Sequence, residues 1–280
     1  MKILVADPAK NITVFVLDPV ENPADRAVLA RAILAEERLK AEQVGFVSPP
    51  ASGPASSLWH LEMAGGEFCG NAARCFGLYA AKTQGLTGKA LVSVSVSGAK
   101  EPVQVEVDTE RNRAAAEMPK PSTVDSVNYG GRSLPVLIFE GIAHVIAPDL
   151  ESKSENFYAI KAELEKKFHL PAALGLMFYD SASSFMRPAV YVRSVDALVF
   201  ESSCGSGSAA LGIWLSREIA DGTANYAIAQ EGGVIETEVV KKAGQVVRVT
   251  IGGEVRLGEA EEFRFNLTAG GSNERNRART

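Results

Sequence analysis

Residues 65–82 read GGEFCGNAARCFGLYAAK and place a Cys-Gly pair directly before a helical pattern. Apolar residues after the glycine recur at spacings of three and four, which predicts an amphipathic helix. The apolar positions of this helix are Ala72, Cys75, Phe76, Tyr79 and Ala80. Cys69 is therefore predicted to lie at the helix N-terminus. Cys75 falls within the apolar stripe, so we expect it to be a core side chain.

A second Cys-Gly pair occurs in residues 201–220, ESSCGSGSAALGIWLSREIA. Apolar residues again follow Cys204-Gly205 at helical spacing, which predicts a second helix that starts at a cysteine. In both segments a glutamate precedes the cysteine by two or three residues, and a small polar residue follows the glycine. These polar and glycine neighbours make simple core packing a poor explanation for Cys69 and Cys204.

The predicted elements around the two pairs follow the same order. In the first half they are strands within 3–18, a helix at 23–39, strands at 42–48 and 58–63, the Cys69 helix, and strands at 91–98, 103–108 and 114–119. In the second half they are strands within 135–148, a helix at 154–168, strands at 174–180, 188–194 and 197–200, the Cys204 helix, and strands at 226–230, 234–240 and 245–253. Such repetition predicts two equivalent α/β domains.

The domain boundaries follow from composition. We expect a first domain at 1–119, a Pro- and Ser-rich linker near 119–128, and a second domain at 120–257. A C-terminal strand near 258–266 is expected to complete the first domain. The polar tail 267–280 is predicted to be disordered.

Composition excludes several classes of function. The net charge of −5 disfavours nucleic acid as a partner. The first ten residues lack the apolar core of a secretory signal, and no apolar run approaches the roughly 18 residues of a membrane span. We therefore expect a cytoplasmic protein. Three histidines without ligand-like spacing predict no metal site, and the absence of pyridoxal or dinucleotide motifs predicts no cofactor.

A cysteine at a helix N-terminus is chemically suited to proton transfer. The unpaired N–H groups and the partial positive charge there stabilise a thiolate and are expected to lower the thiol pKa. The same N–H groups bind anions such as a carboxylate, and Gly70 and Gly205 allow that anion a close approach. Two such sites facing one another would place an acid and a base on opposite faces of an amino-acid Cα. The residues thus predict a racemase that uses Cys69 and Cys204.

The two segments resemble the cofactor-independent racemases of the diaminopimelate epimerase superfamily. The matching motifs are Cys-Gly-Asn-Ala-Ala-Arg-Cys at 69–75 and Cys-Gly-Ser-Gly at 204–207. The resemblance reaches to about residue 265. It implies an α/β (α+β) fold of two pseudo-symmetric domains, each a mixed β-sheet wrapped around a central helix, and it implies a homodimer.

Two departures argue against diaminopimelate as substrate. The family's Asn-Pro-His turn is replaced by Ile142-Ala143-His144, and its Glu-Arg-Gly segment by residues 200–203, Phe-Glu-Ser-Ser. A distal ammonium and carboxylate would therefore be left unpaired, which costs several kcal/mol. The role of His144 stays open at this point, as do those of Glu67 and Glu201.

A nearer resemblance is to the histidine racemases of staphylopine-type metallophore biosynthesis. It rests on the residues at 42–46, 67–72, 96–98, 118–119, 203–207 and 232–233. It implies conversion of L-histidine to D-histidine for an opine-type metallophore. The substrate-binding residues expected from the motifs and the resemblance are Asn11, Glu42, Gln43, Gly70, Asn71, Gly205 and Ser206.

Two other functions stay open on the sequence alone. The first is a racemase or epimerase for another amino acid, of the diaminopimelate, proline or hydroxyproline type. The second is a non-catalytic protein that binds an amino acid or senses redox state through its thiols.

Overall fold

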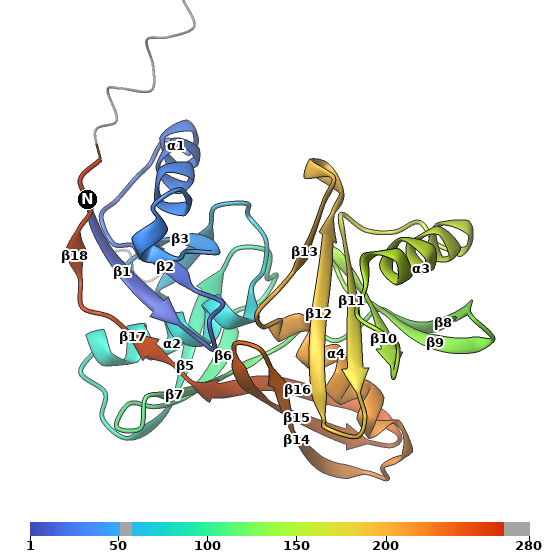
Figure 1. Ribbon diagram of the computed structural model, residues 1–280. Coiled ribbons are helices and arrows are strands. Elements are labelled where there is room, and N and C mark those ends of the chain that lie inside the picture. Colours follow the sequence, from blue (N-terminus) through green and yellow to red (C-terminus); the bar gives the residue numbers. More distant parts are fainter. Residues whose placement is uncertain (51–57, 266–280) are drawn as a thin grey trace, which may run out of the picture.

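The computed structural model describes residues 1–50 and 58–265. The predicted disordered tail 267–280 and most of the segment between the strands expected at 42–48 and 58–63 lie outside the described residues. Figure 1 shows two halves side by side, with helices α1 and α2 in the first half and α3 and α4 in the second.

The first half is a mixed sheet. Its elements are β1 (Lys2–Asp7), β2 (Thr13–Val16), α1 (Pro23–Leu34), β3 (Gln43–Ser48), β4 (His60–Met63), α2 (Gly70–Thr83), β5 (Lys89–Val96), β6 (Val103–Asp108) and β7 (Arg113–Glu117). Strands β2 and β3 pair in parallel, as do β4 and β5. The other successive pairs, β1–β2, β3–β4, β5–β6 and β6–β7, are antiparallel. Each parallel pair is connected through a helix, because parallel strands need a crossover.

The second half repeats this pairing. Its elements are β8 (Thr123–Tyr129), β9 (Arg132–Ile138), β10 (Ile142–Pro148), α3 (Ser154–Lys167), β11 (Ala173–Asp180), β12 (Phe185–Val192), β13 (Ala197–Phe200), α4 (Gly205–Leu215), β14 (Gly222–Gln230), β15 (Gly233–Lys242) and β16 (Gln245–Glu254). The parallel pairs are β10–β11 and β12–β14, again with a helix in each connection. The antiparallel pairs β9–β10, β11–β12, β14–β15 and β15–β16 stand where their first-half equivalents do. The predicted fold class is confirmed.

The central helices α2 and α4 pack into the sheets in the same way. Most residues of both helices are buried, and each has a glycine seven residues after its first residue. A Cβ on Gly77 would lie 2.5 Å from Val105 of β6, and one on Gly212 would lie 2.5 Å from Thr237 of β15. These two glycines therefore let each helix approach its sheet closely.

Three strand pairings join the C-terminal part of the chain to the first half. Strand β16 pairs with β7, which links the sheets of the two halves (Figure 1). The short strands β17 (Arg256–Leu257) and β18 (Glu261–Glu262) both pair with β1. The domain boundaries at residues 119 and 257 stay a prediction.

Two expected elements differ in the structure. The helix expected at 23–39 ends at Leu34, and a separate 3-10 turn at Glu37–Leu39 buries Leu39. The apolar residues keep their helical spacing in the sequence past Leu34, so the pattern predicted a longer helix than the structure contains. The expected linker at 119–128 is wrong, because β8 occupies most of it. Strand β8 is largely exposed, and only Val127 is buried, so its sequence lacks an apolar pattern.

Within the described ranges, no helix is long and apolar enough to cross a membrane.

Candidate active site

Both cysteines cap a central helix, as predicted. Cys69 is the N-cap residue of α2 and Cys204 that of α4, each in extended conformation, so that Gly70 and Gly205 are the first helical residues. The Sγ of Cys69 accepts a hydrogen bond from the N–H of Ala72 at 3.4 Å. Such an N–H group favours the charged form of the sulfur.

The starts of the two helices meet at Ile251 of β16. A Cβ on Gly70 would lie 2.9 Å from Cδ1 of Ile251, and a Cβ on Gly205 would lie 2.6 Å from the same atom. The Cβ on Gly205 would also lie 3.3 Å from Oδ1 of Asn71. The two Cys-Gly pairs therefore belong to one site between the halves, and a side chain at either glycine would obstruct it.

The segment before Cys69 is held by the end of β5. Ser97 donates a hydrogen bond to the carbonyl of Glu67 at 3.0 Å and accepts one from the N–H of Met63 at 2.9 Å. Gly98 has a φ of +72°, and a Cβ there would lie 2.3 Å from the nitrogen of Phe68. Ser97 and Gly98 therefore fix the backbone that presents Cys69.

The segment around Cys204 is held by side chains of its own half. The N–H of Cys204 donates to Oε1 of Gln230 at 2.8 Å. Gln230 in turn donates to Ser208 at 3.0 Å, and Ser208 donates to the carbonyl of Cys204 at 2.7 Å. Ser203 donates to the carbonyl of Ala9 at 2.8 Å, which ties the second half to the turn after β1.

A chain of four side chains crosses the first half toward the site. Nε of Arg74 donates to Oδ1 of Asn71 at 3.2 Å. Nδ2 of Asn71 donates to Oδ1 of Asn11 at 3.1 Å, and Nδ2 of Asn11 donates to Oε2 of Glu42 at 2.6 Å. Arg74, Asn71 and Asn11 are buried, whereas Glu42 is exposed.

Both site thiols are harder to ionise than expected. Burial raises the pKa of Cys69 to about 11, against the opposing N–H of Ala72 and the side chain of Gln43. Burial and then the charge of Glu201 raise the pKa of Cys204 well above its usual value. The predicted lowering of the thiol pKa is therefore wrong in direction, because desolvation outweighs the helix N-terminus.

Two carboxyl groups lie beside the site. Burial raises the pKa of Glu201 to about 7, and the negative charge of Glu42 adds to the rise. Glu42 is exposed as a residue, but partial desolvation of its carboxyl group raises its pKa, with the hydrogen bond from Asn11 acting against the rise and the charge of Asp7 adding to it. A positively charged group between Glu42 and Glu201 would favour the ionised form of both.

His144 is connected to Cys204 through Ser206. Nε2 of His144 lies 3.0 Å from Oγ of Ser206, and that oxygen lies 3.6 Å from Sγ of Cys204. His144 is fully buried, and burial lowers its pKa to about 3, so the ring is neutral.

The structure brings all the predicted site residues together around the two helix starts, and their assigned roles stay predictions. Sequence reasoning assigned no role to Arg74, Ser203 or Gln230, and it left His144 and Glu201 open. Arg74 stands in a quoted motif, so an arginine on the buried side of a helix was the available signal. The contacts of Gln230 and Ser203 depend on tertiary structure and leave no local pattern.

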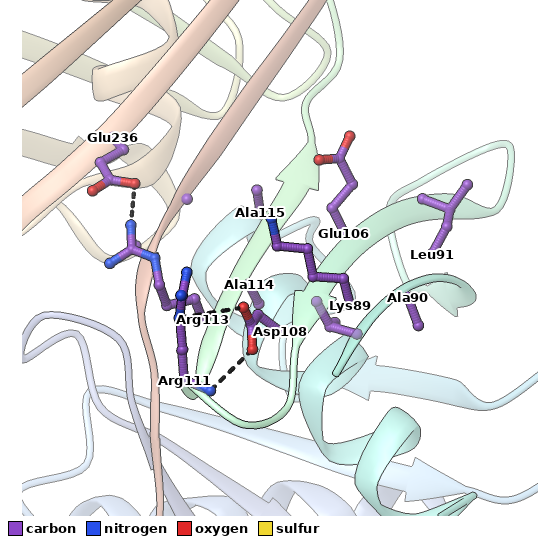
Figure 2. A pocket seen from close by; sticks show the side chains of 13 residues that line it. Lys89, Ala90, Leu91, Glu106, Asp108, Arg111, Arg113, Ala114, Ala115 and Glu236 are labelled. Atoms are coloured by element: carbon purple, nitrogen blue, oxygen red, sulfur yellow. Dashed lines mark hydrogen bonds and ion pairs between the residues drawn. The ribbon is translucent and has the colours of Figure 1, made fainter. Parts of the chain in front are cut away.

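Two surface hollows are lined by residues other than the three cysteines. The larger, with a cavity volume of about 600 Å³, is an open groove over β5, β6, β7, β15 and β16 (Figure 2). Two of its arginines lie beside acidic groups, Arg113 bonded to Glu236 and Arg111 near Asp108. The second, of about 340 Å³, lies beside the turn at Ala9 and Lys10.

Comparison with protein families gives a match over most of the chain. Residues 1–261 match the family described as "Histidine racemase CntK N-terminal domain". A histidine racemase of Fusobacterium nucleatum is 34% identical over 219 residues, which cover 75% of this chain and 80% of that protein. A histidine racemase of Staphylococcus aureus is 26% identical over 235 residues, covering 82% of this chain and 85% of that protein.

Solved structures show the same fold at low sequence identity. A probable proline racemase from Agrobacterium radiobacter has a TM-score of 0.64 at 15% identity, covering 95% of this chain and 93% of that chain. A predicted epimerase from Pseudomonas aeruginosa has a TM-score of 0.65 at 13% identity, covering 95% of this chain and 99% of that chain.

Proposed function

The chain belongs to the histidine racemase family and is an amino-acid racemase, and we propose on that basis that it interconverts L- and D-histidine by proton transfer between Cys69 and Cys204. The observation that carries this proposal is the meeting of the two Cys-capped helices at Ile251. The helices come from equivalent positions of the two halves. Each half therefore contributes one thiol to a single substrate site.

The proposed reaction uses the thiols in opposite roles. The substrate carboxylate binds at the N–H groups of the two helix starts, which offset the negative charge that develops at Cα. One cysteine, as thiolate, takes the Cα proton, and the other, as thiol, donates its proton to the opposite face. No proton is gained or lost overall, and the two sulfurs exchange their protonation states. The proposed reaction requires no cofactor.

One thiol must lose its proton before this cycle can start. Both thiols have a raised pKa, so the neutral form dominates near neutral pH. Glu201 lies beside Cys204 and has a pKa of about 7, so its carboxylate is available at neutral pH. Glu201 can accept the Cys204 proton only in an uphill step, because its own charge raises the pKa of Cys204.

The charges of the site favour a basic substrate. Glu42 is close enough to Glu201 for its charge to raise the pKa of Glu201. The ammonium and imidazole groups of histidine are both hydrogen-bond donors, and a carboxylate accepts from either. Glu42, fixed by Asn11, is therefore proposed to bind one of these groups. A role in opine-type metallophore synthesis, a cytoplasmic location and a homodimer stay predictions.

The test is incubation of the reduced protein with L-histidine in D₂O, without added cofactor, followed by chiral chromatography and mass spectrometry. Cys69→Ser and Cys204→Ser are the site variants. Cys75→Ala is the matched control, because Cys75 lies in α2 within the core of the first half. We expect deuterated D-histidine from the wild type and from the control, and none from either site variant.

Three other results would change the assignment. Turnover of a different amino acid would retain the two-thiol reaction and overturn histidine as substrate. Activity retained in a site variant would exclude that thiol from the reaction. No exchange with any amino acid would favour a binding or redox-sensing protein.

A further inference from the structure

Arg74 is a fully buried cation in the middle of a helix. Its Nη1 donates to the carbonyl of Glu254 at 3.3 Å and its Nη2 to the carbonyl of Pro8 at 3.2 Å. None of the ion pairs found among the described residues includes Arg74. An arginine without a carboxylate partner is costly to bury. Such a residue therefore calls for an explanation beyond packing.

The hydrogen bonds of the four-residue chain can run in only one direction. A guanidinium only donates, so Oδ1 of Asn71 must face Arg74 and Nδ2 must face Asn11. Asn11 then presents its own Nδ2 to Glu42. An ionised carboxylate only accepts, so this end fixes the same direction. Both asparagine amides are thus oriented by the charges at the two ends.

We infer that Arg74 is a positioning residue, which acts through Asn71 and Asn11 to hold Glu42 ionised and in place for the substrate. The inference rests on the proposed function in assigning substrate binding to Glu42. The bond from Asn11 to Glu42 is charge-assisted, because its acceptor is a carboxylate. The hydrogen-bonded chain thus couples the charge of the buried Arg74 to the orientation of the amide that binds the exposed carboxylate of Glu42.

Reversal of the two asparagine amides would disfavour the ionised form of Glu42. If Asn11 turned its Oδ1 toward Glu42, an oxygen would face a carboxylate, and protonation of Glu42 would be favoured. The charge of Asp7, at the end of β1, also raises the pKa of Glu42, and the charge of Glu42 in turn raises the pKa of Glu201, after β13. The donated N–H of Asn11 opposes the effect of Asp7 on Glu42. Its loss is therefore expected to raise the pH at which Glu42 titrates.

Two substitutions of Arg74 separate positioning from packing. Lysine is a donor only, so Arg74→Lys retains the direction of the chain, whereas the amide of Arg74→Gln can donate or accept. Both variants weaken the contacts to Glu254 and Pro8. We expect Arg74→Gln to raise KM for histidine about tenfold or more with little change in kcat, because the charge-assisted hydrogen bond from Asn11 to Glu42 is lost. Arg74→Lys is expected to restore most of the affinity.

Asn71→Asp provides a second route if the Arg74 variants fail to fold. The new carboxylate would form an ion pair with Arg74 and leave Asn11 without its donor, so that Asn11 turns over. Asn112→Asp is the control, because it likewise replaces an amide by a carboxylate beside a cation, Lys82. We expect a raised KM in Asn71→Asp and an unchanged KM in the control.

Titration of Glu42 tests the chain without reference to activity. The carboxyl carbon of Glu42 is followed by NMR in protein labelled with ¹³C-glutamate, and Glu42→Gln identifies its signal. We expect the midpoint to rise by about one pH unit in Arg74→Gln or Asn71→Asp, equivalent to a tenfold change in the ionisation constant. Folded variants with an unchanged Glu42 midpoint would overturn the inference. A wild type that does not racemise histidine would overturn the proposed function instead, and the titration would still decide the role of Arg74.

Discussion

Acidification is expected to destabilise the protein through His144. The ring is fully buried, and its Nδ1 has no hydrogen-bond partner in the described part of the chain. Burial lowers the pKa of His144 from 6.5 to about 3. The unfolded chain therefore binds a proton at a higher pH than the folded protein does. The neutral His144 ring therefore does not lower the free energy of unfolding above pH 6.5, but that free energy decreases as the pH falls from 6.5 toward 3.

The size of this loss follows from the two pKa values. At about pH 5, the solution lies about 1.5 units below the pKa of the unfolded histidine, which corresponds to about 2 kcal/mol of lost stability. Because the folded ring is still neutral there, this figure depends little on the folded pKa. Glu201 acts in the opposite sense. Its pKa is raised to about 7, so the folded protein binds that proton first and gains stability as the pH falls.

The measurement must therefore compare two proteins. His144→Gln places an amide near the position of Nε2, where it can bond to Ser206, and it removes the titration. Unfolding in urea, followed by circular dichroism at about pH 8 and pH 5, gives the free energy of unfolding of each protein. The wild type is expected to lose about 2 kcal/mol more than the variant over this range. Equal losses in the two proteins would refute the reasoning.

Three further predictions concern the thiol, the backbone beside it and a buried lysine. Because burial raises the pKa of Cys69 to about 11, its rate of alkylation by iodoacetamide should increase about tenfold per pH unit between about pH 7 and 10, as measured by mass spectrometry. A rate that stops increasing near pH 8 would contradict this pKa. Gly98→Ala is expected to displace Phe68 and reduce racemase activity while the circular dichroism is retained, and full activity would count against this. Lys241→Met removes the ammonium group that donates to three carbonyls after α4, and it should lower the free energy of unfolding, measured in urea, by about 2–4 kcal/mol. A change near zero would show that water replaces the ammonium group.

The local patterns around the cysteines predicted the helix starts correctly. Gly70 and Gly205 marked the first helical residues, and the repeated order of elements indicated two equivalent halves. These features depend on neighbours in sequence, so periodicity and glycine placement were sufficient. Strand β8 escaped prediction because an exposed edge strand needs no apolar alternation.

The ionisation state of the thiols could not be predicted in the same way. The position of Cys69 at a helix start suggested a lowered pKa, but the surrounding side chains exclude water and reverse the direction. Cys69 packs against the core of the first half, whose strands and helix come from stretches far apart in sequence. The chain from Arg74 to Glu42 likewise joins the β1–β2 turn, the segment before β3 and α2, so no single stretch of sequence contains it.

The pairing of β16, β17 and β18 with the first half has a consequence for synthesis on the ribosome. Strand β1 emerges first, yet its partner Glu262 is added 260 residues after Lys2, and β7 waits for β16 in the same way. Contacts of such long sequence separation form slowly. The sheet of the first half therefore stays incomplete until translation of residue 262, and nascent chains that stop earlier are expected to expose the edges of β1 and β7 to chaperones or to aggregation.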